Sequence, residues 1–555
     1  MSKDLTWIGF ILFIAILVTA VAPFWGIPDG KDLAQHFHFA NTYFDAIRSG
    51  DLFPGWGNKE NFGYGSIGIR FYPPLAYYVA AAFRILTGNW YDALSLSLFF
   101  WMFLGMLGVY FWAREFMPRP YSFSASVLYA FVPYHLSQIY QLMLFSEFAA
   151  AGITPFCFLF LTRLCVNKNL IDALLFSLSV SLLILVHIPT TLICGISLAI
   201  YTSFITDWNN PWKTLRLLAL SGILTLFATA FHWLKIVTEI QWLRHNTDQF
   251  TSGYYDFSVY LFPMYLNAGE KYVQRSLWYF DIAILLTFIV IVPAVIYLIR
   301  AYRNDLSERS GLRILYGVVF TGFAAFFLMT SASKPLWEFA PLLEKIQFPW
   351  RWLSAASLMA SVAFPFAIFL CSKDNFLKRR LVQYLLLSLV LLIALFDISQ
   401  TMLLSEPLPR GKFETKIKEW NSEPGCQCWW PNWASFRAFD EKRPLVSGNR
   451  ELKISKWENE YRRFSVGPGE ELKVRVANFY YPWWKATRNG EEVNVRQGKD
   501  GEIEIPLTTE KSELELYFDE PRTIRWAHYI SLSAWILILS FLIFSSIRRK
   551  FQNQQ

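Results

Sequence analysis

The chain has 555 residues, of which 54% are hydrophobic, 18% aromatic and only 17% charged. A soluble protein of this length needs a larger charged surface, so this composition indicates a membrane protein and excludes a disordered chain, a disulfide-rich secreted scaffold and a collagen-like fibre. The net charge of +8 says little about nucleic acid, because membrane proteins carry excess Lys and Arg in their cytoplasmic loops. The sequence has no zinc-finger spacing, phosphate-binding glycine loop or dinucleotide fingerprint.

Twelve apolar runs predict spans of a bilayer, and the first shows no cleavage site after it, which indicates an uncleaved helix. The orientation follows from the distribution of Lys and Arg among the connecting segments. With the N-terminus inside, every predicted cytoplasmic connection is basic. Both termini are therefore expected in the cytoplasm. The predicted spans are 5–27, 91–112, 120–140, 148–166, 170–187, 190–206, 214–237, 277–299, 312–331, 352–371, 381–400 and 526–547. The predicted cytoplasmic segments are 114–119, 163–168, 213–216, 300–313, 373–380 and 548–550.

One further apolar stretch, residues 72–86, is not counted as a span. It is short, begins with Pro73-Pro74 and contains Arg84. Counting it would also place the later basic loops outside. We therefore expect it to lie along the outer membrane surface.

Three segments then face outward: 28–90, 238–276 and 405–522. The last contains runs with the two-residue period of strands, and Asn489-Gly490 is typical of a hairpin turn. The expected fold is an α-helical polytopic membrane protein of about 12 transmembrane helices with a small outer β-sandwich. Its predicted divisions are a transmembrane domain (1–404), a β-rich domain (405–522) and a final helix with a cytoplasmic tail (523–555).

The six cysteines give little functional information. Four lie in apolar runs and read as small hydrophobic residues. Cys426 and Cys428 form a single Cys-x-Cys, which is too little for a metal site and leaves a disulfide and two unused thiols equally open.

The first outer segment carries the most informative polar residues. Asp29 and Asp32 lie just beyond the first span, and His36 follows Asp32 by four residues, which on a helix places both side chains on one face. A carboxylate there could act as a general base or bind a divalent metal, Mg²⁺ or Mn²⁺. On spacing alone, the plainer interpretation is a polar helix facing water.

From Asp32 to Tyr78 this segment resembles the GT-C superfamily of integral-membrane glycosyltransferases. The likeness lies in an acidic residue soon after the first span, then 48–54 (RSGDLFP), 63–65 (GYG) and 71–75 (FYPPL), which opens an interfacial helix. The chain is still more similar to bacterial membrane proteins of the YfhO type and to those described as 6-pyruvoyl-tetrahydropterin synthase related. No zinc-binding histidine set supports pterin chemistry.

The resemblance implies a multi-pass protein of the bacterial cytoplasmic (inner) membrane. Such an enzyme would move a sugar from a polyprenyl-phosphate donor to a glycan, lipid or protein acceptor at the outer face. Asp32 matches the catalytic base by position, and Asp29 is the alternative base and substrate contact. His36 would orient the base, bind the acceptor or join a metal site. No cofactor is certain, a divalent metal stays open, and membrane lipids but no nucleic acid are expected partners.

Other outward-facing polar residues are candidates for substrate binding. Glu147 and His187 lie at predicted span ends, where they are costly unless paired or hydrated. Arg351, in Phe348-Pro349-Trp350-Arg351-Trp352, could bind a lipid phosphate, as could Arg70 more weakly. Tyr72 opens the interfacial helix. For Glu147 and His187 the alternative is a hydrated helix end, and for Arg351 it is an arginine that snorkels within an aromatic belt.

Two other functions remain open. A lipid or oligosaccharide transporter would be expected to show repeated halves and broken helices at the midplane, and no clear repeat is visible. An assembly factor for envelope polymers would not need Asp32. The clustering of ionisable residues at outer span ends favours chemistry at the surface.

Overall fold

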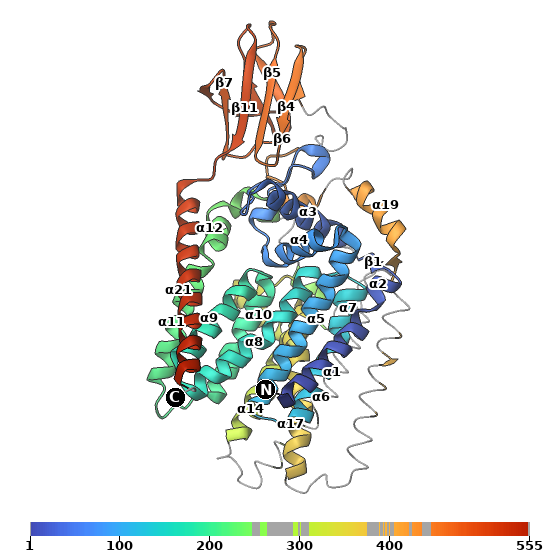
Figure 1. The fold of residues 1–555 in the computed structure, drawn as a ribbon, viewed down its shortest axis with the longest axis vertical. Helices are drawn as coiled ribbons and strands as arrows, with labels where there is room; N and C mark the ends of the chain where they lie inside the picture. The colour runs from blue at the N-terminus through green and yellow to red at the C-terminus, as the bar shows by residue number, and fades with distance from the viewer. Residues whose placement is uncertain are drawn as a thin grey trace.

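The computed structural model has two parts, a bundle of helices and a C-terminal region of β-sheet. Figure 1 shows both chain ends at one end of the bundle and the sheets at the opposite end. The expected combination of membrane helices and a C-terminal β-region is therefore confirmed. The structure describes residues 2–30, 32–246, 256–262, 310–373, 405–420, 425–435 and 446–552, with isolated helical residues within 292–300 and 388–399.

Six helical segments among the described residues are long and apolar enough to cross a membrane. A seventh is formed if α11 (Trp212–Ala228) and α12 (Ala230–Glu239), which are bent by 70° against each other, make one span. The six involve α5 (Trp90–Arg114), α8 (Phe145–Asn167), α10 (Ile188–Ile205), α14 (Ser310–Leu328), α17 (Leu353–Lys373) with the preceding turn η9 (Pro349–Trp352), and α21 (Arg522–Gln552).

The predicted count of twelve spans is thus not confirmed. Predicted spans 277–299 and 381–400 lie outside the described residues, apart from isolated positions. The predicted span 120–140 is two helices, because Pro133 cannot continue the hydrogen-bonded ladder of the first. The shorter helices at predicted spans are α1 (Ser2–Thr19) with α2 (Val21–Phe24), α6 (Arg119–Ala130) with α7 (Pro133–Tyr140), and α9 (Leu170–Ile184).

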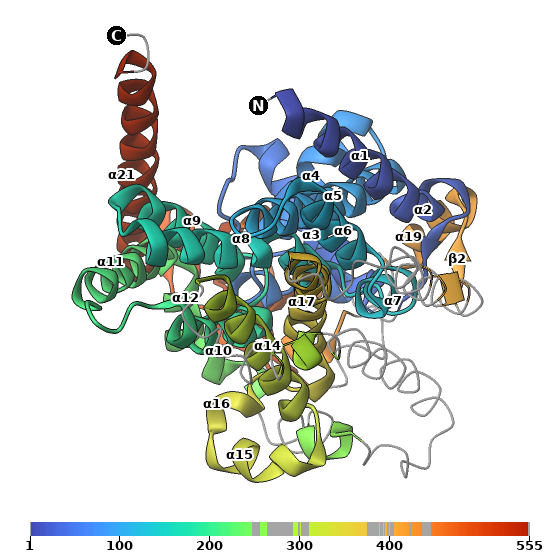
Figure 2. The ribbon, with the colours of Figure 1, turned by 90° about the horizontal axis from the view of Figure 1, so that it is seen from below.

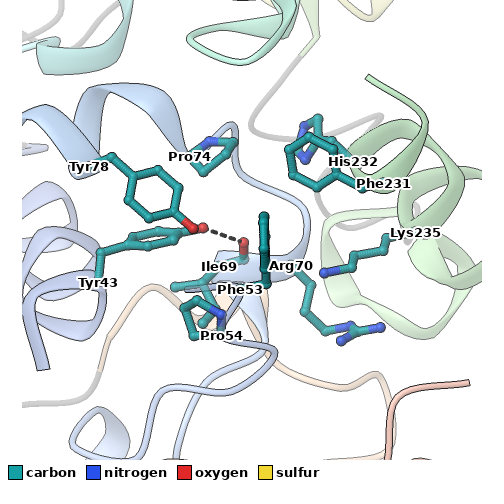
Figure 3. A pocket seen from close by; sticks show the side chains of 10 residues that line it. All are labelled: Tyr43, Phe53, Pro54, Ile69, Arg70, Pro74, Tyr78, Phe231, His232 and Lys235. Atoms are coloured by element: carbon teal, nitrogen blue, oxygen red, sulfur yellow. Dashed lines mark hydrogen bonds between the residues drawn. The ribbon is translucent and has the colours of Figure 1, made fainter. Parts of the chain in front are cut away.

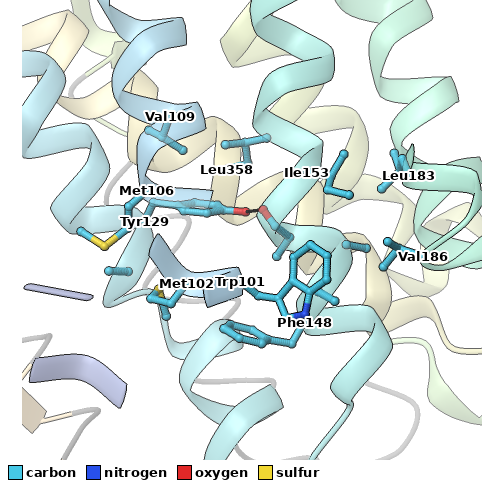
Figure 4. Close-up of a cluster of buried hydrophobic side chains, with 14 of the residues drawn as sticks. Trp101, Met102, Met106, Val109, Tyr129, Phe148, Ile153, Leu183, Val186 and Leu358 are labelled. Carbon is cyan, nitrogen blue, oxygen red and sulfur yellow. Dashed lines mark hydrogen bonds between the residues drawn. The ribbon is translucent and has the colours of Figure 1, made fainter. Parts of the chain in front are cut away.

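Close packing of α5 on α8 forms the centre of the bundle. A Cβ atom at Gly152 would lie 2.9 Å from the carbonyl oxygen of Trp101, so only glycine allows this approach of the two backbones. Around the contact, Trp101, Phe148 and Ile153 belong to a buried apolar cluster (Figure 4). Since Phe148 directly follows Glu147, this packing fixes the end of α8 that carries a predicted site residue.

The first outer segment forms two helices, α3 (Leu33–Ser49) and α4 (Leu75–Thr87), which lie between the long helices and the sheets (Figure 1). The 13 residues of α4 correspond to about 20 Å, which is shorter than a hydrocarbon core of about 30 Å. This length agrees with the expected surface helix. The loop between α3 and α4 contains Gly63 and Gly65 with φ of 91° and 84°, a backbone conformation that glycine adopts without strain.

The C-terminal β-region has two antiparallel sheets that enclose an apolar core. One has the strand order β3-β6-β10-β9 and the other β4-β5-β11-β7-β8. The predicted hairpin is confirmed: Ala486 pairs with Val493 across Asn489-Gly490, whose φ angles of 51° and 88° suit a type I′ turn. The strands are β3 (Val446–Ser447), β4 (Leu452–Trp457), β5 (Tyr461–Val466), β6 (Lys473–Phe479), β7 (Trp484–Arg488), β8 (Glu491–Val493), β9 (Arg496–Gln497), β10 (Glu502–Pro506) and β11 (Ser512–Phe518).

Short elements connect the two parts of the structure. Strand β1 (Ile27–Pro28), which follows α2, pairs with β2 (Pro407–Leu408) ahead of α19 (Arg410–Trp420). At the opposite end of the bundle, Asp4 of α1 accepts hydrogen bonds from Tyr110 (2.9 Å) and Arg119 (2.7 Å). The N-terminal helix therefore begins among the basic residues predicted to be cytoplasmic.

This arrangement predicts which positions an impermeant maleimide can reach in intact cells. Cysteines introduced at the exposed Lys453 or Lys485 of the β-region should react from outside, whereas Arg548→Cys should react only after permeabilisation. The unsubstituted chain is the control for its native cysteines. Labelling of the β-region only after permeabilisation would reverse the topology and remove the site from the outer face.

Candidate functional site

A largely buried ion pair between Glu147 and Arg351 anchors the candidate site. Arg351 lies in η9, and its Nε donates to Oε2 of Glu147 at 3.1 Å, with the two side chains 12% and 2% exposed. The other carboxylate oxygen, Oε1, accepts hydrogen bonds from Tyr134 and, at 3.1 Å, from Gln138 of α7. Both oxygens of the carboxylate are therefore occupied, as a buried charge requires.

The guanidinium of Arg351 is held on a second side by its own segment. Its Nη1 donates to the carbonyl oxygen of Ile346 at 2.8 Å and to Oε1 of Gln347 at 2.9 Å. Within the described part of the chain, Nη2 makes no hydrogen bond. The planar group is thus fixed in orientation with one nitrogen left for a ligand.

The hydroxyl of Tyr72 links further predicted residues to this ion pair through its electrostatic environment. Burial raises the pKa of its hydroxyl, the carboxylates of Asp32 and Glu147 raise it further, and the charge of Arg351 lowers it. All three charged groups therefore act electrostatically on this one hydroxyl. They come from three separate parts of the chain, since Asp32 is the N-cap of α3, Glu147 is in α8 and Arg351 is in η9.

Two buried histidines stand beside this group in their neutral form. Nδ1 of His36 is hydrogen-bonded to the hydroxyl of Tyr77 at 2.7 Å, and Ser146 donates to that hydroxyl at 3.0 Å. Burial lowers the pKa of His36 to about 3. Burial also lowers the pKa of His187, and the charge of Arg351 lowers it further. Arg351 is thus the cation of the cluster near neutral pH.

Asp32 and Asp29, the two predicted bases, occupy different surroundings. Asp32 is exposed, and its carboxylate does not cap its own helix. Asp29 lies beside the β1–β2 pair, where its backbone N–H donates to the carbonyl oxygen of Glu406 at 2.8 Å. Burial raises the pKa of Asp29. The positive charge of Lys416 opposes this effect, and the negative charge of Glu406 adds to it. The carboxylate of Asp32 acts on the Tyr72 hydroxyl, whereas the charged neighbours of Asp29 are Lys416 and Glu406.

Arg70 has a structural environment and not the expected contact with a phosphate. Its side chain is 0% exposed, and Nε and Nη2 donate to the carboxylate of Glu239 in α12 at 2.9 and 2.8 Å. Nη1 pairs with Glu520, which follows β11. Figure 3 shows Arg70 and Lys235 beside a cavity of about 20 Å³, room for about one water. The carboxylates of Glu239 and Glu520 already bind this guanidinium. Arg70 therefore holds the fold together here and does not have the predicted role of binding a lipid phosphate.

Trp429 is a residue of this region that the sequence did not single out. Its ring lies 5.7 Å from that of Tyr72 and is stacked on that of His245 at 5.1 Å. Nε2 of His245 lies 3.3 Å from Nε2 of Gln347, which holds Arg351. The signal in the sequence was the aromatic run 429–433 (WWPNW), but nothing in it indicates which ring reaches the site.

The segment carrying Trp429 is fastened to the first outer segment. The backbone N–H of Gly425 donates to Oδ1 of Asn61 at 2.7 Å, and that of Cys426 donates to Oε1 of Gln35 at 2.9 Å. A disulfide joins Cys426 to Cys428, which decides between the two alternatives left open. A Cβ at Gly68 would come within 3.0 Å of the Trp429 ring, so glycine is needed for this contact.

The donor set does not match a divalent metal bound by the described residues. No group of three or more His, Cys, Asp or Glu side chains in that part of the chain is placed to hold an ion. Both oxygens of Glu147 are already taken by Tyr134, Gln138 and Arg351.

Comparison with known families gives a match over more than half of the chain. Residues 69–404 match the family model described as "6-pyruvoyl-tetrahydropterin synthase related domain; membrane protein". The chain belongs to this family. The family resemblance expected from the sequence is confirmed, and so is the assignment as a membrane protein. No curated protein matches the chain.

Among solved structures, the chain is similar to the oligosaccharyltransferase of Archaeoglobus fulgidus in its apo form. The identity is 15% and the TM-score 0.42, over 76% of this chain and 56% of the other. It is also similar to ArnT from Cupriavidus metallidurans bound to undecaprenyl phosphate, with 12% identity and a TM-score of 0.34, over 66% and 78%. The chain thus spans little more than half of the oligosaccharyltransferase. The residues described above, and not these distant likenesses, support the function proposed below.

The environment of Arg70 predicts a large loss of stability when its charge is removed. Arg70→Ala leaves Glu239 buried without its ionic partner, which costs about 3–5 kcal/mol. Thermal unfolding of the purified variant should therefore shift strongly to lower temperature. Lys473→Ala breaks an exposed pair with Glu504 (2.8 Å) and should cost less than about 1 kcal/mol. Equal unfolding temperatures for the two variants would contradict this role of Arg70.

Proposed function

We propose that the chain is a membrane glycosyltransferase that moves a sugar from a polyprenyl-phosphate-linked donor to a glycan, lipid or protein acceptor at the outer face of the membrane. The observation that supports it is the meeting of Asp32 and Arg351 around Tyr72. An exposed carboxylate and an immobilised guanidinium are the two groups that such a transfer needs. The resemblance of the first outer segment to GT-C enzymes points to the same chemistry.

In this proposal Asp32 acts as the general base. Its carboxylate takes the proton of an acceptor hydroxyl while that oxygen forms a bond to the anomeric carbon of the donor sugar. The bond from that carbon to the phosphate oxygen breaks, and the electron pair leaves with the lipid phosphate. Because Asp32 is exposed, an acceptor can reach it from water.

Arg351 would stabilise the charge that collects on the leaving phosphate. A phosphate needs little protonation to leave, but it does need a nearby positive charge. The bonds from Glu147, Gln347 and Ile346 hold the guanidinium in one orientation before the donor binds. A pre-oriented charge costs no reorganisation during the reaction.

Tyr72 and the two neutral histidines would complete the substrate contacts. The hydroxyl of Tyr72 lies close to both charged groups, and burial keeps it protonated. Neutral His36 and His187 add hydrogen-bonding capacity without a competing positive charge. His36 would contribute through its hydrogen bond with Tyr77.

Asp32→Asn should abolish sugar transfer and leave folding nearly unchanged. Loss of a general base typically costs about a hundred- to ten-thousand-fold in rate, whereas an exposed side chain contributes little to stability. The measurement is transfer of a labelled sugar from lipid donor in vesicles. Asp29→Asn is the matched control and should retain activity. Full activity of Asp32→Asn would reject Asp32 as the base, and full activity with both aspartates replaced would favour a transporter or assembly factor.

Arg351 should show a different pattern from Asp32. Arg351→Ala should weaken donor binding, visible as a raised KM, and Arg351→Lys should rescue it only in part because an ammonium lacks the planar fork. Direct binding of radiolabelled polyprenyl phosphate to the purified variants separates this effect from the rate of transfer. Unchanged donor binding in Arg351→Ala would exclude the proposed phosphate contact.

A further inference from the structure

A groove runs along the side of the helical bundle between α10 and α11. Its volume is about 450 Å³, and α8 and α9 contribute apolar side chains, among them Leu161, Phe176 and Val180. Figure 2 shows α10 and α11 as separate ribbons, with α8 and α9 in the same part of the bundle. A groove of this size has room for a ligand of matching chemistry.

Glycines keep the groove open on both of its sides. Gly195 of α10 and Gly222 of α11 line it, and a Cβ atom added at either would meet nothing within 4 Å. Neither glycine has a positive φ, so backbone conformation does not demand glycine at these positions. The absence of side chains at these two positions leaves room for a ligand in the groove.

The hydroxyl groups that line the groove are satisfied within the protein. Thr202, Ser203, Ser221 and Thr225 each donate to a backbone carbonyl oxygen, at distances of 2.6 to 3.3 Å. The indole Nε1 of Trp208 likewise donates to a carbonyl oxygen at 2.8 Å. The lining therefore offers little that would hold water, and such apolar cavities stay dry and accept apolar ligands.

The groove is continuous with the surface that faces the membrane. Ile223, Leu226 and Phe227 of α11 are each more than half exposed, and α10 is one of the membrane-length helices. At one end of the groove, Trp208 and Trp212 are 58% and 68% exposed. Tryptophan at such a position marks the boundary between headgroups and hydrocarbon.

The length of the groove suits a single leaflet. From Gly195 to Ser203 the axis of α10 rises by about 12 Å, close to the depth of about 15 Å of one leaflet. Lys168 pairs with Asp207 at 3.6 Å, which places the Trp208 end with the basic ends of the helices. The groove therefore opens into the leaflet opposite the β-region.

We propose that this groove is a resident binding site for one hydrocarbon chain of a membrane phospholipid, whose head group lies at the level of Trp208. The chain fills the space left by Gly195 and Gly222 and joins α10 to α11. This site is independent of the sugar transfer proposed above, because it lies away from Asp32 and Arg351 and needs neither residue.

The test uses the full chain in vesicles of phosphatidylethanolamine and phosphatidylglycerol that contain a trace of phosphatidylglycerol with a diazirine on its acyl chain. After illumination, mass spectrometry locates the cross-linked peptides. The parent chain should be labelled within 195–203 and 218–225. The double variant Gly195→Leu/Gly222→Leu fills the groove and should lose this labelling at least about tenfold. Gly9→Leu is the matched control, since Gly9 of α1 also has nothing within 4 Å.

Three outcomes overturn the proposal. The first is parent labelling that avoids both segments, a result that does not depend on any variant. The second is labelling that persists in the filled variant. The third is labelling that polyprenyl phosphate abolishes at low concentration, which would assign the groove to the tail of the donor. Leucine is a better helix former than glycine, so both variants should fold, and their thermal unfolding checks this.

Discussion

The buried guanidinium of Arg70 is the contact on which the outer end of the molecule depends. It joins three parts of the chain, since Arg70 belongs to the first outer segment, Glu239 to α12 and Glu520 to the link between β11 and α21. Tyr481 of the β-region donates to the same Glu239 at 2.7 Å. Removing any one partner would leave a charge in a medium that solvates it poorly. Tyr72, two residues beyond Arg70, takes its place in the candidate site from this junction.

A second buried ion pair, between Glu147 and Arg351, likewise joins separate parts of the chain at the candidate site. Such pairs add little net stability over apolar residues of the same volume, because desolvation offsets their attraction. What they provide is a fixed orientation. The energy of the bundle comes from apolar packing such as that around Phe148, while the ion pairs determine where the functional groups point.

Much of this organisation was open to prediction, because local pattern determines it. The period of the β-strands and the Asn489-Gly490 turn depend on neighbours in sequence. The number of membrane spans was harder to predict from the sequence, because the break at Pro133 and the bend at Thr229 divide apolar runs that look continuous. For the site, the structure groups five predicted residues around Tyr72, namely Asp32, His36, Glu147, His187 and Arg351. Their catalytic and binding roles stay predictions. Their partners, and the separate positions of Arg70 and Asp29, depend on tertiary contacts that no spacing encodes. Trp429 reaches the site from more than 350 positions beyond Tyr72.

The link between β11 and α21 has a consequence for how the β-region can move. Only residues 519–521 separate the strand from the membrane helix, a tether of about 14 Å at full extension. If the contacts of Arg70 with Glu520 and of Trp429 with Tyr72 were both broken, the β-region would still be confined to the same end of the bundle. Its effective concentration there would be in the millimolar range or above. A β-region that separated from the bundle would therefore stay close to its docking contacts and could dock again without separate machinery.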